Sequence, residues 1–294
     1  MPYLATALIV CAALFINYSP LIDLWPDAMR GSDAEQAAYF ALLYGGIYFL
    51  TALFCQDARG PHYLRDFRFY ALATVLICLV TIPKLSVLHP FSFKTMEGLS
   101  KGEMVFGYKC QFFLWQGIVA FGGLLLLSLV SKDLRLREIG LTTRQWDARP
   151  YLMVLAIVLP LVVIASFATD FQRAYPQYKA WMFPEVFGMG PVAQGGIFEM
   201  CYGSAFLTVE VLFRGALVIG MVRIMGPRAI LPAVAMYCTF HFGKPLGEAI
   251  GSVVGGYILS VFALHSRSVL GGVVVHLGVA MGMELCAYVQ HLLR

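Results

Sequence analysis

The sequence predicts an all-α protein, a polytopic bundle of about eight or nine transmembrane helices. Of its 294 residues, 60% are hydrophobic and only 13% are charged, whereas a soluble domain carries about 25% charged residues. Mean hydropathy is +0.75. The apolar residues are grouped into long blocks, each close to the roughly 20 residues that a spanning helix needs. A water-soluble fold could not cover this much apolar surface with so few charges.

Nine apolar blocks follow one another along the chain. The first begins directly after Met1 with no basic residue before it, so we expect a spanning helix rather than a removable signal peptide. The seventh and eighth are separated only by a turn around Gly243, so eight spanning helices and one half-inserted segment fit nearly as well. The blocks cover roughly residues 3–18, 37–55, 69–88, 110–130, 151–168, 197–222, 229–243, 246–264 and 269–292.

The loops carry the information on orientation. Lysine and arginine are more frequent in the even-numbered loops than in the odd-numbered ones, a comparison that includes Arg30, Arg59 and Lys94. Because basic residues favour the cytoplasmic side, we expect the N-terminus and the even loops in the cytoplasm. We therefore expect an integral protein of a bacterial inner membrane, in contact with the lipid bilayer. The formal net charge of +4 gives no case for a nucleic-acid partner.

Ionisable residues are concentrated in the last four apolar blocks. A charge at the centre of a spanning helix costs about 3 kcal/mol or more, so such residues usually face the bundle interior and have a partner. The first five blocks hold almost none, which places the chemistry in the C-terminal third of the chain. The ionisable residues of the last four blocks are Glu199, Glu210, Arg214, His241, Glu248, His276 and Glu284.

Glu210, His241 and His276 are candidates for one shared site. At about 1.5 Å per helical residue, Glu210 and His241 each lie roughly 18 Å from the cytoplasmic end of their blocks, and His276 lies one to two turns shallower. Arg214 follows Glu210 by four residues, so we expect an ion pair on one helix face. A purely structural ion pair would not explain two histidines in the membrane. We therefore favour a site for proton exchange.

Other features are open to two interpretations. The glycine pairs Gly251/Gly255 and Gly278/Gly282 predict places where helices approach closely, as in many membrane bundles. The long loop at 169–196 is rich in aromatic residues, and an amphipathic flap and a plain connector are equally good interpretations of it.

Three segments around the candidate residues resemble the motifs of the CPBP family, which contains CAAX prenyl proteases and bacteriocin-processing or immunity proteins. That family carries Glu-Glu-x-x-x-Arg, Phe-x-x-x-His and His-x-x-x-Asn (or a small residue) on successive helices. The resemblance covers about residues 135–292. It implies a CPBP-like core at 131–294, preceded by a transmembrane extension of about four helices at 1–130. The matching segments are Val209-Glu210-Val211-Leu212-Phe213-Arg214, Tyr237-Cys238-Thr239-Phe240-His241 and His276-Leu277-Gly278-Val279-Ala280.

The chain departs from the family pattern at three positions. Val209 replaces the first glutamate, which the family uses to activate water, and Ala280 replaces the frequent asparagine, a possible oxyanion donor. Tyr237 replaces a phenylalanine. Either Glu210 serves as the base, or another carboxylate does, or the protein has lost proteolysis. Glu248 is the best substitute, in the first turn of the next predicted helix, although it would equally well complement the positive end of that helix.

The resemblance implies an intramembrane endopeptidase of the glutamate type, acting on a membrane-embedded or membrane-proximal peptide or protein. In this hypothesis Glu210, paired with Arg214, takes a proton from water, His241 holds that water or passes protons, and His276 donates to the oxyanion. No cofactor is implied. A zinc site is disfavoured because no His-Glu-x-x-His pair is present. The alternatives are an inactive member that acts in peptide immunity or as a scaffold and, ranked last, a small transporter without the usual internal repeat.

Overall fold

The computed structural model describes residues 1–19, 31–56, 62–85, 88–89, 91–93, 96–144 and 146–293. Within these ranges the regular elements are all helices, and the one extended feature is an isolated bridge between Val186 and Met189. The all-α prediction is therefore confirmed. Arg30, Arg59 and Lys94, which contribute to the predicted orientation, lie outside the described residues.

In the described part of the chain, six helical stretches are long and apolar enough to cross a membrane, which supports an integral membrane protein. The predicted eight or nine spans are not confirmed. The sixth and seventh predicted blocks fall within one 50-residue stretch, and the first and fifth correspond to the 17-residue helices Pro2–Tyr18 and Arg149–Ala165. The six stretches are Asp33–Cys55, Phe67–Lys84, Lys101–Val130, Pro191–Phe240, Leu246–Ser266 and Leu270–Leu292.

Side-chain caps define where several N-terminal helices begin. Ser32 and Ser100 each form a capping box with the glutamate three residues later, Glu35 and Glu103, and Asp66 caps the helix that follows it. The elements are α1 (Pro2–Tyr18), α3 (Asp33–Phe40), the π-helix η1 (Ala41–Gly46), α4 (Ile47–Cys55), η2 (Tyr63–Arg65), α5 (Phe67–Thr81), η3 (Ile82–Lys84) and α6 (Lys101–Val130).

The C-terminal half contains a second and longer π-helix, which begins directly after Glu210. Chain reversals follow at Gly226 and Gly243, whose φ angles of 68° and 85° suit glycine. The elements are η5 (Leu136–Glu138), α7 (Arg149–Ala165), α8 (Thr169–Ala174), η6 (Ala180–Met182), α9 (Pro191–Glu210), the π-helix η7 (Val211–Gly220), α10 (Val222–Met225), η8 (Gly226–Ala229), α11 (Ile230–Phe240), α12 (Leu246–Ser266) and α13 (Leu270–Leu292).

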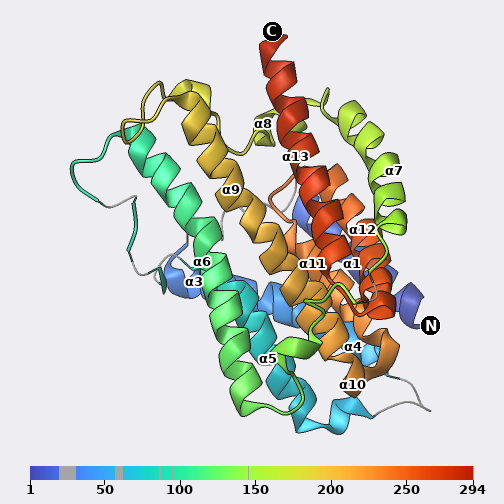
Figure 1. Cartoon of the computed structure of the whole chain (residues 1–294). Helices are drawn as coiled ribbons and strands as arrows, with labels where there is room; N and C mark the ends of the chain where they lie inside the picture. The colour runs from blue at the N-terminus through green and yellow to red at the C-terminus, as the bar shows by residue number, and fades with distance from the viewer. Residues whose placement is uncertain are drawn as a thin grey trace.

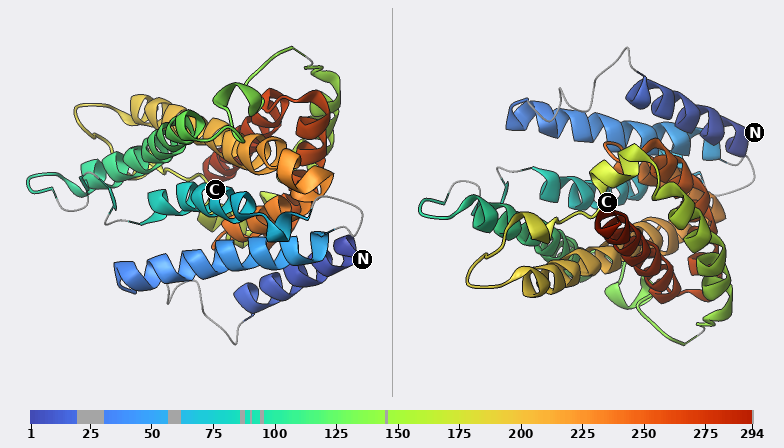
Figure 2. Two further views of the ribbon diagram at one scale, coloured as in Figure 1. Left: turned by 90° about the horizontal axis from the view of Figure 1, so that it is seen from below. Right: turned by 90° about the horizontal axis from the view of Figure 1, so that it is seen from above.

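The helices are arranged around α11 and η7. Helix α6 packs along α9, α7 packs along α13, and α11 lies between α4 and α12 (Figure 1). Helices α1, α3 and α4 lie together on one side of the bundle in both views of Figure 2. The 191–240 stretch is the most buried of the six candidate spans. The end of α9 that carries Glu210 is covered by its neighbours, whereas Val192, Ile197 and Met200 nearer its start are exposed.

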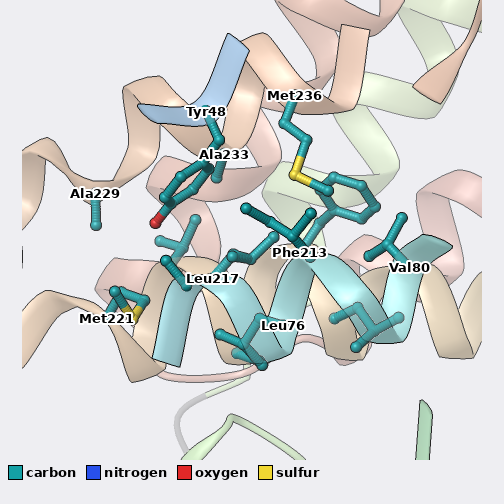
Figure 3. Packing of buried hydrophobic residues seen from close by; sticks show 14 of the residues in the cluster. Tyr48, Leu76, Val80, Phe213, Leu217, Met221, Ala229, Ala233 and Met236 are labelled. Carbon is teal, nitrogen blue, oxygen red and sulfur yellow. The ribbon is translucent and has the colours of Figure 1, made fainter. Parts of the chain in front are cut away.

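The largest apolar cluster lies where η7 meets the N-terminal helices. Phe213 and Leu217 of η7 pack with Leu76 of α5 and Tyr48 of α4, and all four side chains are buried (Figure 3). Burial of an aromatic or aliphatic side chain of this size stabilises a fold by about 1.5–3 kcal/mol. This cluster fixes the start of η7, and with it the position of the site.

Candidate functional site

Glu210 is the last residue of α9 and is completely buried. Its Oε1 lies 3.0 Å from Nη1 of Arg214 and 3.2 Å from Nδ1 of His276. Arg214, in the first turn of η7, is only 1% exposed. The predicted ion pair is therefore present and fully buried, and the carboxylate also contacts one of the two predicted histidines.

Gly272 lets the carboxylate of Glu210 approach α13. A Cβ atom at position 272 would overlap Oε2 of Glu210, so the two helices can pack here only because residue 272 has no side chain. Oε2 of Glu210 and the Nε and Nη2 atoms of Arg214 have no hydrogen-bond partner among the described residues. Buried polar atoms of this kind are commonly satisfied by ordered water. The carboxylate and the guanidinium are therefore suited to hold a water molecule.

Tyr237 of α11 connects the groups of the site. Its hydroxyl lies 3.1 Å from Nε2 of His276, and its ring lies under the guanidinium of Arg214, 4.1 Å from Cζ. Its backbone carbonyl accepts a 2.9 Å hydrogen bond from Nδ1 of His241. Because a carboxylate accepts, Nδ1 of neutral His276 donates to Glu210, and Nε2 then accepts from the Tyr237 hydroxyl.

His241 and Glu248 form the second half of the network. His241 ends α11, and its Nε2 lies 4.0 Å from Oε1 of Glu248, too far for a hydrogen bond. Glu248 accepts instead from Nζ of Lys244 at 2.5 Å and from the hydroxyl of Tyr175 at 2.6 Å. Burial, together with the neighbouring Glu248, raises the pKa of the Tyr175 phenol far above its usual range. Tyr175 therefore remains protonated and keeps donating to the carboxylate.

The five residues predicted for the site thus lie in one network with two carboxylate–imidazole pairs. Glu210 pairs with His276, Glu248 lies beside His241, and Tyr237 contacts both imidazoles. No hydrogen bond or ion pair joins Glu210 directly to His241. The expected meeting of Glu210, His241 and His276 is therefore a chain through Tyr237 rather than a three-way contact.

Val209 and Ala280, the two positions where the CPBP motifs have polar residues, are packed against apolar side chains. Val209 belongs to the large apolar cluster with η7 and α5, and Ala280 belongs to a second cluster with Phe198 and Tyr202. Neither position supplies a polar atom to the network. Among the described residues, no group of three or more histidine, cysteine, aspartate or glutamate side chains is placed to hold a metal ion.

Comparison with known proteins adds no relative. No family model matches the chain, and no curated protein and no solved structure matches it. A functional assignment therefore depends on the side chains and contacts described above.

Proposed function

We propose that the protein is an intramembrane endopeptidase that cleaves a membrane-embedded or membrane-proximal peptide with glutamate-activated water. The chain from Glu210 through His276 to Tyr237, drawn from three helices and buried except for a partly exposed His276, is the observation that carries this proposal. Keeping a carboxylate, a guanidinium and two imidazoles inside an apolar bundle is costly, so such groups usually mark function. The order of the three motifs, which resembles that of the CPBP family, supports the same reaction class.

In this mechanism Glu210 is the general base. Its Oε2, which has no hydrogen-bond partner in the described part of the chain, takes a proton from water, and the water oxygen adds to the carbonyl carbon of the scissile peptide bond. The carbon–nitrogen bond then breaks as the proton passes to the leaving amine. Both nitrogens of His276 are occupied, by Glu210 and Tyr237. Because Nε2 of His276 accepts in its bond with Tyr237, the Tyr237 hydroxyl must turn from His276 to donate to the oxyanion, or His276 must first take up a proton at Nε2 and donate from there. Such a donor contributes about 3 kcal/mol in soluble proteases.

Glu248 is the second candidate for the base. Its side chain is 16% exposed, whereas that of Glu210 is fully buried, so water reaches Glu248 more directly. It also lies beside His241, which could pass the proton to the leaving amine. In this alternative the Glu210–Arg214 pair positions His276 and takes no proton from water.

Cleavage assays with matched carboxylate variants separate these assignments. Purified wild-type protein, incubated with membranes from a strain that lacks the gene, is expected to produce new protein termini detectable by mass spectrometry. Glu210→Gln should produce none, and Glu138→Gln, which alters a half-buried loop carboxylate paired with Arg223, should match the wild type. Full cleavage by Glu210→Gln and none by Glu248→Gln would instead identify Glu248 as the base.

An inactive CPBP-fold protein acting in peptide immunity or as a scaffold is the competing function, favoured by the apolar surroundings of Val209 and Ala280. The same experiment decides between them. A Glu210→Gln/Glu248→Gln double variant that folds, inserts and retains the full cellular phenotype would support the scaffold and contradict the peptidase.

We also infer that the protein lies in a bacterial inner membrane with its N-terminus in the cytoplasm. Two of the basic loops that predict this orientation lie at the same end of the bundle, because Glu138 pairs with Arg223 at 2.9 Å. Fusions of a cytoplasm-specific reporter to the loop at 131–148 are expected to be active, and inactive fusions there would reverse the assignment.

A further inference from the structure

A cavity of about 390 Å³ lies where α9 begins and α13 ends, beneath the segment that joins α8 to α9. Figure 1 shows these two helix ends close together at the end of the bundle opposite α10. Cavities of 300–1,000 Å³ are typical of ligand sites. The network around Glu210 shares no residue with the lining of this cavity, which includes Tyr178, Trp181, Glu199, Glu284 and Tyr288.

Two glutamates line the cavity, and no basic residue is part of its lining. Glu284 is only 6% exposed, and its carboxylate accepts the backbone N–H of Gln177. Glu199 and Glu284 share a side-chain hydrogen bond, so the pair holds a proton between its two carboxyl groups. Oε2 of Glu199 is enclosed and has no hydrogen-bond partner within the described ranges. Lys109 and Lys179 donate to the backbone carbonyls of Gln177 and Arg173, and neither lines the cavity. The charge of Lys109 acts on Glu284 from outside the lining. An enclosed carboxylate pair in this setting favours a positively charged ligand.

The remaining lining suits an organic cation better than a metal ion. The ring centres of Trp181 and Tyr288 are 6.0 Å apart, and Trp181 also stacks on His291 with ring centres 3.8 Å apart. Aromatic faces attract ammonium and guanidinium groups. Apolar side chains such as Met281 and Leu285 would contact an aliphatic stem. Magnesium and calcium, by contrast, take six or more oxygen ligands.

The cavity also lies at a fixed distance from the proposed site along the same two helices. Glu284 follows His276 by eight residues and Glu199 precedes Glu210 by eleven. At about 1.5 Å per residue, these separations are about 12 and 16 Å along the helix axes. An extended peptide covers about 3.3 Å per residue, so four or five residues span the gap.

We propose, building on the endopeptidase function, that this cavity binds a lysine or arginine side chain of the substrate about four or five residues from the scissile bond. A lipid ammonium group is the less suitable occupant. Its phosphate would lie beside the same two carboxylates, and no basic residue lines the cavity to compensate for it. Glu199 and Glu284 are therefore specificity residues that select basic membrane peptides.

Binding is tested with n-octylammonium chloride as the probe and octanol as its uncharged control. The protein is held in nanodiscs, and unfolding is followed by tryptophan fluorescence. Octylammonium should raise the Tm of the wild type and of Glu138→Gln, and the shift should vanish in a Glu199→Gln/Glu284→Gln double variant. An equal shift in wild type and double variant would overturn the cavity as an amine site. If the wild type and the double variant differ in Tm only when the nanodisc contains phosphatidylethanolamine, a lipid head group is the occupant instead.

Specificity is tested by comparing the termini that wild type and double variant release from the same membranes. Wild-type cleavage sites should show a basic residue four or five positions away. For a peptide so identified, the double variant should raise KM about tenfold or more with little change in kcat, and replacing that basic residue with glutamine should abolish the difference. Cleavage with no basic preference would overturn this inference and leave the peptidase intact. Absence of any wild-type cleavage would overturn both, and an octylammonium shift would then indicate an amine-binding cavity alone.

Discussion

Tyr237 has contacts that its identity alone did not suggest. Tyr237 stands where the CPBP motif has phenylalanine, yet its hydroxyl donates to His276 and its ring lies under Arg214. Tyr237→Phe removes only the hydroxyl and keeps the ring packing. We expect the variant to fold, because a single hydrogen bond contributes about 1 kcal/mol. Cleavage should fall about 10- to 100-fold, because His276 loses the partner of Nε2.

Initial rates at saturating substrate, measured beside a Tm for each protein, check this expectation. Tyr63→Phe is a suitable control, because its hydroxyl donates to the carbonyl of Ala52, outside the network and the cavity. Wild-type kcat in Tyr237→Phe would show that the hydroxyl has no part in the reaction.

Spacing and charge predicted some of these residue contacts and could not predict others. The four-residue step from Glu210 to Arg214 fixes a shared helix face, so the ion pair follows from local geometry alone. The contacts of Tyr237 with His276 and of Tyr175 with Glu248 join residues 39 and 73 positions apart. Such contacts depend on how whole helices are packed. The position of a tyrosine in an apolar sequence does not predict which acceptor its hydroxyl will bond.

At the scale of the elements, glycine sets how closely α9 and α13 approach. Gly272→Ala would place a methyl group on Oε2 of Glu210, so the helices must separate or the carboxylate must leave Arg214 and His276. We expect the free energy of unfolding to fall by about 2 kcal/mol or more, as for other overpacked sites, and cleavage to be lost. Gly255→Ala is the matched control. No described atom lies within 4 Å of a Cβ there, and alanine favours the helix.

Reversible unfolding in mixed micelles measures the free energy of unfolding of both variants. A Gly272→Ala protein as stable and active as Gly255→Ala would show that α9 and α13 are not held together at Glu210.

Hydropathy predicted where apolar helices occur but not how they are built. The expectation of close packing is wrong for Gly251 and Gly255, which have no described neighbour within 4 Å of a Cβ, whereas Gly278 and Gly282 face leucines of α7. The π-helix η7 was not predicted, because its residues have the composition of any buried helix. Its register depends on the tertiary packing of Phe213 and Leu217 against α4 and α5. Such π-helical segments occur often at functional sites.

At the scale of the whole molecule, the N-terminal helices contact the turn that carries His241. The hydroxyl of Tyr18, at the end of α1, donates a 2.7 Å hydrogen bond to the carbonyl of Lys244. Nζ of Lys84 lies 4.3 Å from the ring centre of Phe240, the residue before His241. Residues 1–130 therefore support the site directly, even though the resemblance begins only near residue 135.

This arrangement predicts that Tyr18→Phe changes catalysis without unfolding the bundle. Losing the bond to Lys244 frees the turn at 241–245, so His241 and Glu248 should be held less firmly, and kcat should fall about threefold to tenfold with an unchanged KM. Tyr70→Phe is the matched control, because Tyr70 makes the same kind of bond to the carbonyl of Leu64, far along the chain from the site. Cleavage kinetics with one peptide substrate measure both. Equal kcat values for the two variants would mean that the N-terminal helices only anchor the bundle, and the site would then be complete within residues 131–294.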